Sequence, residues 1–378
     1  MWKRDRMVLL AALLLLGAGG CSGTGPAAPS FFSVVLIPDT QQYAEVAPKT
    51  FWAQTRWVAG EKEALNITAA IHLGDMVQTD DMKEWQIADA AYDALDAASI
   101  PYSVVPGNHD LALMHGGSHR DASRFNIYFG PNRFEKKPWY GGHYDVGSLD
   151  TGGGNENNYI FFEAMGLEFM VVSLELGPRD EVIQWANDLI AAHPQRRVII
   201  ATHSYLCYDN TRVGSVEHEP GTDDCWAPKH YIGPNREGDK RGADGEEMWH
   251  TLVKRHSNVF MVVSGHVLKD GAGYLESTGI HGNRVHQILA NYQLIGYGWL
   301  RVLRFVPSED KIYVEPDTPL RLGRYTDDYK HFTDVNYFDS PFVSLPIWKR
   351  FGIPRGFRLR DNPQHAFVLD YEMTQAKQ

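Results

Sequence analysis

The sequence predicts an α/β fold built around a parallel sheet. Short apolar runs typical of buried strands alternate with longer segments in which apolar residues recur at helical spacing. The first five segments follow the order strand, helix, strand, helix, strand, which favours parallel strands joined by right-handed crossovers. Glycine, proline or polar residues end most of the apolar runs. With 378 residues, 43% of them hydrophobic, the chain is long enough to bury a large core.

The first part of the chain supplies three strands and two helices. Each predicted strand is a short apolar run, and each predicted helix is longer and amphipathic. The second helix begins near Thr79 or Asp80, since either residue type is a good N-cap. The expected elements are a strand over 32–37, a helix over about 49–65, a strand over 67–73, a helix to about 98 and a strand over 101–105.

A long loop then interrupts the alternation. Residues 111–158 are rich in glycine, asparagine, histidine and aromatic residues, and long loops in compact domains are usually functional or mobile. A hairpin is expected around Met165 and Gly166, where two apolar runs meet. The later expected elements are strands over 159–162 and 168–174, a helix over 179–192, a strand over 197–201, a loop over 204–243, a helix over 245–256, a strand over 259–263, and strand-like runs near 284–290, 298–306, 311–315 and 366–371.

The N-terminal segment has the features of a targeting signal. Basic residues precede the apolar run Val8–Leu16, which is too short for a comfortable membrane span. An Ala-Gly-Gly-Cys sequence ending at Cys21 resembles a bacterial lipobox. We therefore expect residues 1–21 to be a lipoprotein signal peptide and residues 22–30 a tether, with the protein anchored to a membrane on the periplasmic or cell-surface side. The alternatives are an ordinary secretory signal, or an N-terminal anchor with an incidental cysteine.

Charge and cysteine content narrow the possible partners. The formal net charge is −11 and no lysine or arginine cluster stands out, so the sequence does not indicate a nucleic-acid groove. An anionic substrate would need local positive charge, which a bound metal ion can supply. In an oxidising compartment Cys207 and Cys225 could form one disulfide that closes a loop, and the alternative is two unpaired thiols.

Polar residues of metal-binding type follow five of the predicted strands. Strand ends of a parallel sheet meet at one edge, so groups far apart in sequence can converge there. Carboxylates, amide oxygens and neutral imidazoles are ligands that divalent first-row metals accept. Each residue alone could be a turn former or a structural histidine, but that explanation does not account for their shared position. The residues are Asp39 with Gln41, Asp75, Asn108 with His109, His203, and His266.

The ordered set resembles the calcineurin-like metallophosphoesterase superfamily. The family pattern is Asp-x-His, Gly-Asp, Gly-Asn-His-Asp/Glu, a lone His after a strand, and Gly-His-x-His. The corresponding segments here are Asp39-Thr40-Gln41, Gly74-Asp75, Gly107-Asn108-His109-Asp110, Thr202-His203 and Gly265-His266-Val267-Leu268. The resemblance implies a four-layer α/β/β/α sandwich with two central mixed β-sheets over residues 31–315. Residues 316–378 would be a C-terminal extension packed on that domain.

The resemblance also implies two unequal metal positions. Asp75, Asn108, His203 and His266 would form the firm position. Asp39, Gln41 and the bridging Asp75 would form a weaker one, because Leu268 stands where the family has a second histidine. Asp270 is a candidate replacement for that missing ligand. The ions would be divalent, and the sequence does not distinguish Mn, Mg, Ca, Zn or Fe.

The implied reaction is metal-dependent hydrolysis of a phosphomonoester or phosphodiester by metal-activated hydroxide. His109 would assist the leaving group, and Asp110 would orient its ring. Gln78 stands where purple acid phosphatases have Tyr and where Asp-Arg-Gly begins in Ser/Thr protein phosphatases, so the chain resembles bacterial secreted phosphoesterases instead. The substrate would be a small-molecule or lipid phosphoester. The missing ligand at Leu268 motivates the rival hypothesis, a catalytically weak metal-binding protein with a ligand- or partner-binding role.

Overall fold

The computed structural model describes residues 30–111, 120–145, 154–217, 227–232, 242–293, 298–319 and 363–373. The predicted signal peptide with Cys21 lies outside the described residues, as does Cys225, so the lipid anchor and the disulfide stay predictions. Within the described ranges, no helix has the length and apolar character needed to cross a membrane.

The described chain forms β-strands, α-helices and short 3₁₀ turns, with most of the helices in its first two thirds. The strands are β1 (Phe32–Ile37), β2 (Ile67–His72), β3 (Tyr102–Val104), β4 (Tyr140–His143), β5 (Asn158–Ala164), β6 (Leu167–Leu174), β7 (Arg197–Thr202), β8 (Val259–Ser264), β9 (Ala272–Thr278), β10 (Arg284–Ala290), β11 (Leu300–Val306), β12 (Lys311–Asp317) and β13 (Phe367–Asp370). The α-helices are α1 (Gln41–Val46), α2 (Pro48–Gly60), α3 (Met82–Ala97), α4 (Ser123–Phe129), α5 (Pro131–Phe134), α6 (Asp180–Ala192) and α7 (Gly245–Thr251). Short 3₁₀ turns are η3 (Pro228–His230), η5 (Val253–Arg255) and η6 (Pro307–Glu309).

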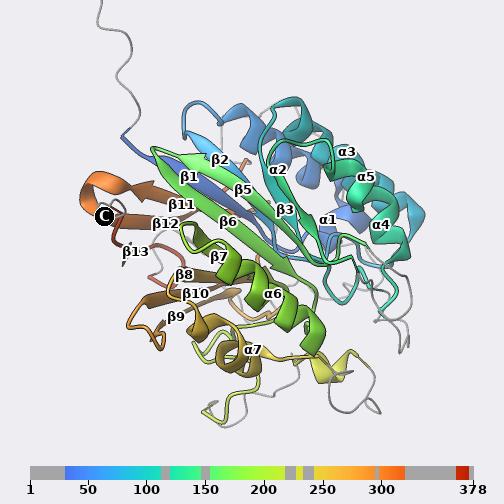
Figure 1. The fold of residues 1–378 in the computed structure, drawn as a ribbon. Coiled ribbons are helices and arrows are strands. Elements are labelled where there is room, and N and C mark those ends of the chain that lie inside the picture. The colour runs from blue at the N-terminus through green and yellow to red at the C-terminus, as the bar shows by residue number, and fades with distance from the viewer. Residues whose placement is uncertain are drawn as a thin grey trace, which may run out of the picture.

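Two mixed sheets form the centre of the molecule (Figure 1). The six-stranded sheet has the order β13-β12-β11-β1-β2-β3, in which β1, β2 and β3 are parallel. The seven-stranded sheet has the order β4-β5-β6-β7-β8-β10-β9, in which β6, β7, β8 and β10 are parallel. The predicted fold class, with two mixed sheets and flanking helices, is confirmed.

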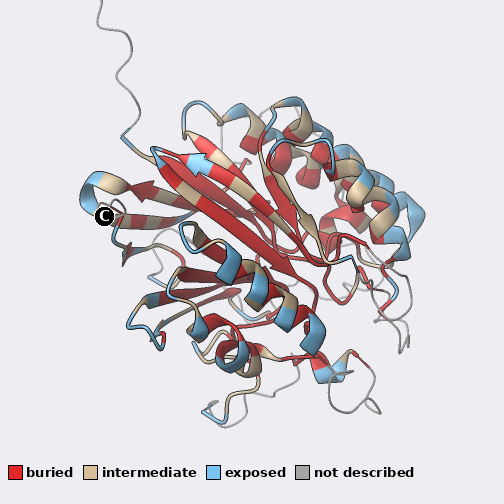
Figure 2. Cartoon of the chain, in the orientation of Figure 1, coloured by how far each residue is buried: buried red, intermediate tan, exposed pale blue. Residues whose placement is uncertain are grey.

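The apolar patterning explains the layers. Between the sheets, Phe169 of β6 packs edge-on against Phe32 of β1, with 5.5 Å between ring centroids. Helices α2 and α3 bury their apolar faces on the six-stranded sheet, and α6 and α7 bury theirs on the seven-stranded sheet (Figure 1). Figure 2 shows the consequence: the strands are largely buried, and exposed residues lie mainly on the outer faces of the helices and at the turns.

Capping and packing interactions set the ends of several helices, and some of these ends differ from those predicted from the sequence. Helix α3 begins one or two residues later than predicted, because Asp81 provides the N-cap and accepts a hydrogen bond from the Lys83 amide (2.7 Å). Helix α2 ends at Gly60 instead of near residue 65. The segment expected to be one long loop contains α4, α5 and β4, because aromatic residues such as Phe125 pack onto Trp85 of α3.

The C-terminal residues complete the six-stranded sheet. Strand β12 continues to Asp317, and β13 from the predicted C-terminal extension pairs with it in antiparallel register. Beyond β13, Tyr371 stacks on Phe260 of β8 with 4.1 Å between ring centroids. The described part of the tail therefore links both sheets at the end of the sandwich where β7 and β8 begin.

Candidate metal centre

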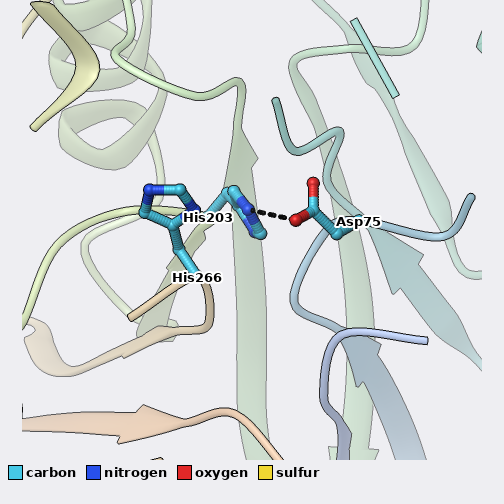
Figure 3. Close-up of side chains that lie close together, drawn as sticks. All are labelled: Asp75, His203 and His266. Atoms are coloured by element: carbon cyan, nitrogen blue, oxygen red, sulfur yellow. Dashed lines mark ion pairs between the residues drawn. The ribbon is translucent and has the colours of Figure 1, made fainter. Parts of the chain in front are cut away.

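The predicted ligands lie just beyond the carboxyl ends of strands from both sheets. Asp39 follows β1 and Asp75 follows β2, while His203 and His266 follow β7 and β8. Candidate ligand atoms of Asp75, His203 and His266 all lie within 4.8 Å of one another, and all three residues are buried. Figure 3 shows His203 between the other two, with its imidazole directed at the Asp75 carboxylate. The distance from His203 Nε2 to Asp75 Oδ2 is 3.2 Å.

The other predicted ligands join the same cluster. Asn108 Oδ1 lies 3.2 Å from His203 Nε2. The Gln41 amide donates to Asp75 Oδ2 (3.0 Å). Asp39 accepts hydrogen bonds from the backbone N–H of His266 at 3.0 and 3.3 Å. The structure thus brings all six predicted ligand residues together at one rim of the sandwich.

The orientation of His203 suits a ligand. Its Nδ1 lies 2.7 Å from the backbone carbonyl of Leu73. Because a carbonyl oxygen can only accept, Nδ1 carries the hydrogen and Nε2 faces the carboxylate and amide oxygens. Ligating histidines in metalloproteins are commonly held by such an outer hydrogen bond.

Electrostatics also indicate a place for a cation. Burial alone would lower the pKa of His203, but Asp75 and Asp39 raise it to about 9. Burial would raise the pKa of Asp75, but the surrounding histidines, His203 above all, hold it well below its usual range. Burial raises the pKa of Asp39 to about 8. In the metal-free protein the His203 proton therefore balances the buried carboxylate of Asp75, and a divalent ion would take over that role by displacing it.

Glycines in the three Gly-containing motifs permit this close packing. A Cβ atom at any of these positions would come closer than 3.0 Å to a site side chain contributed by a different loop. The pairs are Gly74 with His203 Nδ1, Gly107 with Asp75 Oδ1, and Gly265 with Asp39 Oδ1. Each glycine therefore makes room for a neighbouring polar residue, which is why the motifs have Gly directly before the functional residue.

Two of the site residues have strained backbones. Asp75 has φ 54° and His266 has φ 68°, in the left-handed region that residues with a Cβ rarely adopt. Such conformations cost roughly 1–3 kcal/mol each and cluster at functional sites. Here the bends turn both side chains back toward the shared centre.

His109 lies beside the cluster and is oriented by a backbone group. Its Nδ1 lies 2.6 Å from the carbonyl oxygen of Gln78, and its backbone N–H donates to Asp75 Oδ1 (3.0 Å). The Nε2 atom is 4.0 Å from Asp75 Oδ2, and the side chain is 11% exposed. His109 is thus the most accessible of the imidazoles at the centre described above.

The expected contact between Asp110 and the His109 ring is wrong. Asp110 is fully buried and accepts hydrogen bonds from the backbone N–H groups of Gly107 (2.9 Å), Met76 (2.8 Å) and Val77 (3.1 Å). The carboxylate therefore ties the loop after β3 to the loop after β2. It turns away from the ring because these three amides need an acceptor in a buried place.

Sequence reasoning missed Asn291, which directly follows β10 at the same rim. Its side-chain amide donates to Asp39 Oδ2 (2.9 Å) and to the carbonyl of His266 (2.9 Å). The available signal was its position, since it is one more polar residue directly after an apolar strand.

Asp270 was a candidate replacement ligand, but its carboxylate accepts a hydrogen bond from the Ala272 amide (3.3 Å) within its own turn.

Sequence reasoning also missed His72, the last residue of β2. The Gly74 N–H donates to its Nδ1 (3.1 Å), so Nε2 carries the hydrogen and donates to Thr40 Oγ1 (3.0 Å). Burial lowers the pKa of His72 to about 3, so the ring is neutral. It connects the loops that carry Asp39 and Asp75.

Comparison with known proteins agrees with this geometry. The family model described as calcineurin-like phosphoesterase matches residues 32–270. A curated relative, the uncharacterized protein YvnB of Bacillus subtilis (strain 168), is 31% identical over 325 residues, which cover 83% of this chain and 21% of that protein. The chain therefore spans about a fifth of that relative's length.

Similar solved structures include two phosphatases. A dimetal phosphatase from Danio rerio is 14% identical with a TM-score of 0.45, covering 77% of this chain and 97% of that one. A purple acid phosphatase from yellow lupin (Lupinus luteus) is 15% identical with a TM-score of 0.41, covering 78% and 52%.

Proposed function

The chain belongs to the calcineurin-like phosphoesterase family, and from this premise we propose that it hydrolyses a phosphomonoester or phosphodiester with bound divalent metal and with His109 assisting the leaving group. The observation that carries the proposal is the convergence of carboxylate, amide and imidazole groups from both sheets within a few ångströms. A divalent cation held there would supply a nucleophilic hydroxide at neutral pH and stabilise charge on the phosphoryl group.

The donor set fits a divalent ion. The site combines buried oxygen and imidazole ligands, which divalent ions accept. In the part of the chain that the structure describes, neither Asp39 nor Asp75 forms an ion pair with a Lys or Arg side chain. In addition, Gln41 Oε1 is buried and has no hydrogen-bond partner within the described ranges. Such an atom is costly unless a ligand satisfies it.

We further propose that one ion is held firmly and a second more weakly. Asp75, Asn108, His203 and His266 would hold the firm ion. At the weaker position both oxygens of Asp39 already accept protein hydrogen bonds, and Gln41 points its NH₂ group at Asp75.

Calorimetric titration of metal-free protein with Mn²⁺ tests whether the two proposed positions differ in metal affinity. Two binding steps of different affinity are expected, and Gln41→His should tighten the weaker one by about tenfold, since imidazole is a stronger ligand for such ions. Gln42→His is the matched control, because Gln42 contacts Gln78 and not Asp75. Two steps of equal affinity in the wild type would contradict the proposal.

His109 has the geometry of a proton donor. Because Nδ1 donates to a carbonyl, proton transfer is confined to Nε2, which lies on the Asp75 side of the ring.

The substrate would be a small-molecule or lipid phosphoester. The N-terminal segment supports the further proposal that the protein is an extracytoplasmic lipoprotein, which palmitate labelling of wild type and Cys21→Ala would test.

A second candidate function follows from the departures at the weaker position. With Leu268 in place of a ligand and Asn291 bound to Asp39, the protein could bind metal and a ligand with little turnover. Hydrolysis of 4-nitrophenyl phosphate and bis(4-nitrophenyl) phosphate with added Mn²⁺ decides between the two. The hydrolase requires a metal-dependent rate that falls strongly in Asn108→Ala, falls less in His109→Ala because 4-nitrophenolate departs without a proton, and is unchanged in the surface control His250→Ala. The absence of that rate, or its survival in both site variants, favours the binding protein.

A further inference from the structure

The ring of His109 depends on a backbone carbonyl for its orientation. Nδ1 lies 2.6 Å from the Gln78 oxygen, and a carbonyl oxygen can only accept a hydrogen bond. Nδ1 therefore keeps its hydrogen in both charge states of the ring. A backbone carbonyl has no side chain of its own to hold it, so the direction of Nε2 depends on what fixes the loop at Gln78.

Glu84 fixes this loop from one side. Its Oε2 accepts the backbone N–H groups of Gln78 (2.6 Å) and Thr79 (2.9 Å), and its Oε1 accepts the Thr79 hydroxyl (2.6 Å). Glu84 lies in the first turn of α3 and is only 7% exposed. Placing a carboxylate in such a position is costly unless hydrogen bonds satisfy it, and all three of these bonds go to the loop.

A role in starting the helix does not explain Glu84. The N-cap of α3 is already Asp81, which accepts the Lys83 amide. Glu84 instead reaches back past the helix start to residues 78 and 79. Its hydrogen bonds stabilise one conformation of the loop whose carbonyl contacts His109.

Gln42 fixes the same residue from the other side. Its side-chain NH₂ donates to Gln78 Oε1 at 3.1 Å. Gln42 comes from α1, directly after Gln41, whose amide contacts Asp75. Gln78 is therefore held between α1 and α3, on the side of the centre where His109 lies.

We propose that Glu84 and Gln42 are positioning residues for phosphoester hydrolysis, which hold the Gln78 carbonyl so that His109 Nε2 is directed at the leaving-group oxygen. This inference rests on the proposed function. As a water oxygen bonds to phosphorus and the bond to the leaving group breaks, the Nε2 proton passes to the departing oxygen. A proton from the water restores Nε2–H, so the net reaction consumes one water.

The proposal predicts a dependence on the leaving group. An alkoxide needs a proton as it departs, whereas 4-nitrophenolate is stable without one. Loss of positioning should therefore slow hydrolysis of an alkyl phosphoester much more than that of its 4-nitrophenyl counterpart. A defect that only loosens the fold or the metal centre would slow both substrates alike.

The experiment compares kcat and KM of the full-length, Mn²⁺-loaded protein on a methyl and a 4-nitrophenyl phosphoester. Glu84→Gln keeps the size of the side chain but replaces an acceptor oxygen with an NH₂ group. We expect Glu84→Gln and Gln42→Ala to lower kcat for the methyl ester by about tenfold and for the nitrophenyl ester by less than about threefold, with KM little changed. His109→Ala is the reference variant. Glu247→Gln is the matched control, because Glu247 caps the start of α7 and does not contact His109.

The outcomes separate the inference from the function on which it rests. If His109→Ala slows both esters equally, the role of His109 as proton donor fails, and the inference fails with it. If His109→Ala discriminates between the esters but Glu84→Gln and Gln42→Ala do not, only the inference is overturned. The double variant Glu84→Gln/His109→Ala should be no slower than His109→Ala, and an additive loss would also overturn the inference. Should circular dichroism show that Glu84→Gln does not fold, Gln42→Ala alone decides the question.

Discussion

The two ends of the sandwich are built from different interactions. At the carboxyl ends of the parallel strands, charged and polar groups are buried together, and Asp75 and His266 adopt left-handed backbones. At the opposite end, where β7 and β8 begin, the contacts are those of ordinary packing. Tyr371 stacks on Phe260, and its hydroxyl accepts a hydrogen bond from Arg197 (2.7 Å).

This difference indicates a division between function and stability. The centre concentrates desolvated carboxylates and strained residues, which cost free energy that the rest of the fold must offset. The opposite end contributes burial and aromatic contacts, and one short C-terminal segment joins both sheets there. Substitutions at the centre should therefore change metal binding and activity first, while substitutions at the other end should change the free energy of unfolding first.

The largest effect is expected at the centre, for Asp75→Asn. Asp75 is the carboxylate shared by both proposed metal positions, and it contacts Gln41, His203 and the backbone of His109. Loss of its charge should remove metal, lower thermal stability in the presence of metal and reduce hydrolysis by about 10³-fold or more. Elemental analysis of the purified variant measures the metal directly, and an unchanged metal content would refute the assignment.

At the opposite end, Tyr371→Ala should lower the free energy of unfolding. Removing this ring deletes the stack on Phe260 and the hydrogen bond from Arg197, so we expect a loss of about 3 kcal/mol in the free energy of unfolding. Activity per folded molecule should stay within about twofold, because the ring is at the far end of the strands. Urea denaturation with parallel assays measures both quantities. Val368→Ala on β13, which is 49% exposed, should cost less than about 0.5 kcal/mol.

Gly107→Ala tests how closely the centre is packed. The new Cβ would clash with Asp75 Oδ1 and His203 Nε2, so the loop must shift and activity should fall by about 10²-fold. Gly166→Ala is a suitable control, since no atom lies within 4 Å of the new Cβ, and any loss it shows comes from its φ of +78°, a strain that Gly107 lacks. That control should lose some stability and keep metal affinity. Equal metal affinities in the two variants would mean that the close approach does not matter.

The two ends should also differ in how their contributions to the free energy of unfolding depend on pH. In metal-free protein the pKa of His203 is raised to about 9, so its contribution to stability is complete below about pH 6.5 and is lost as the pH rises through 9. Burial lowers the pKa of His286, near the other end, so its contribution is present above about pH 6.5 and is lost as the pH falls.

Denaturation of metal-free protein should therefore show one loss of stability as the pH rises through 9, from His203, and another as the pH falls below about 6.5, from His286. Excess metal should remove the alkaline decline, because the ion replaces the His203 proton. The acid decline should persist with metal and weaken in His286→Gln. An alkaline decline that is the same with and without metal would contradict the assigned role of His203.

Much of the centre could be predicted because it follows from periodicity and topology. Apolar runs of strand length ended at Asp39, Asp75, His203 and His266, and parallel strands bring such ends to one edge. The function of Asp110 could not be predicted, because its neighbour in sequence, His109, is not its partner in space. Its carboxylate satisfies three backbone amides instead, two of them from a loop more than 30 residues away.

The order of apolar and polar residues is enough to predict which residues end the strands and that candidate oxygen and nitrogen ligands gather at one rim. These features depend on local backbone preferences and on the alternation of apolar and polar residues. Which atom each polar group faces depends instead on how the two sheets pack, as for Asn291 and Asp39, which lie 252 positions apart. The physical reason is that a hydrogen bond depends on ångström-scale distances and directions, which the packing of the two sheets fixes and no local pattern encodes.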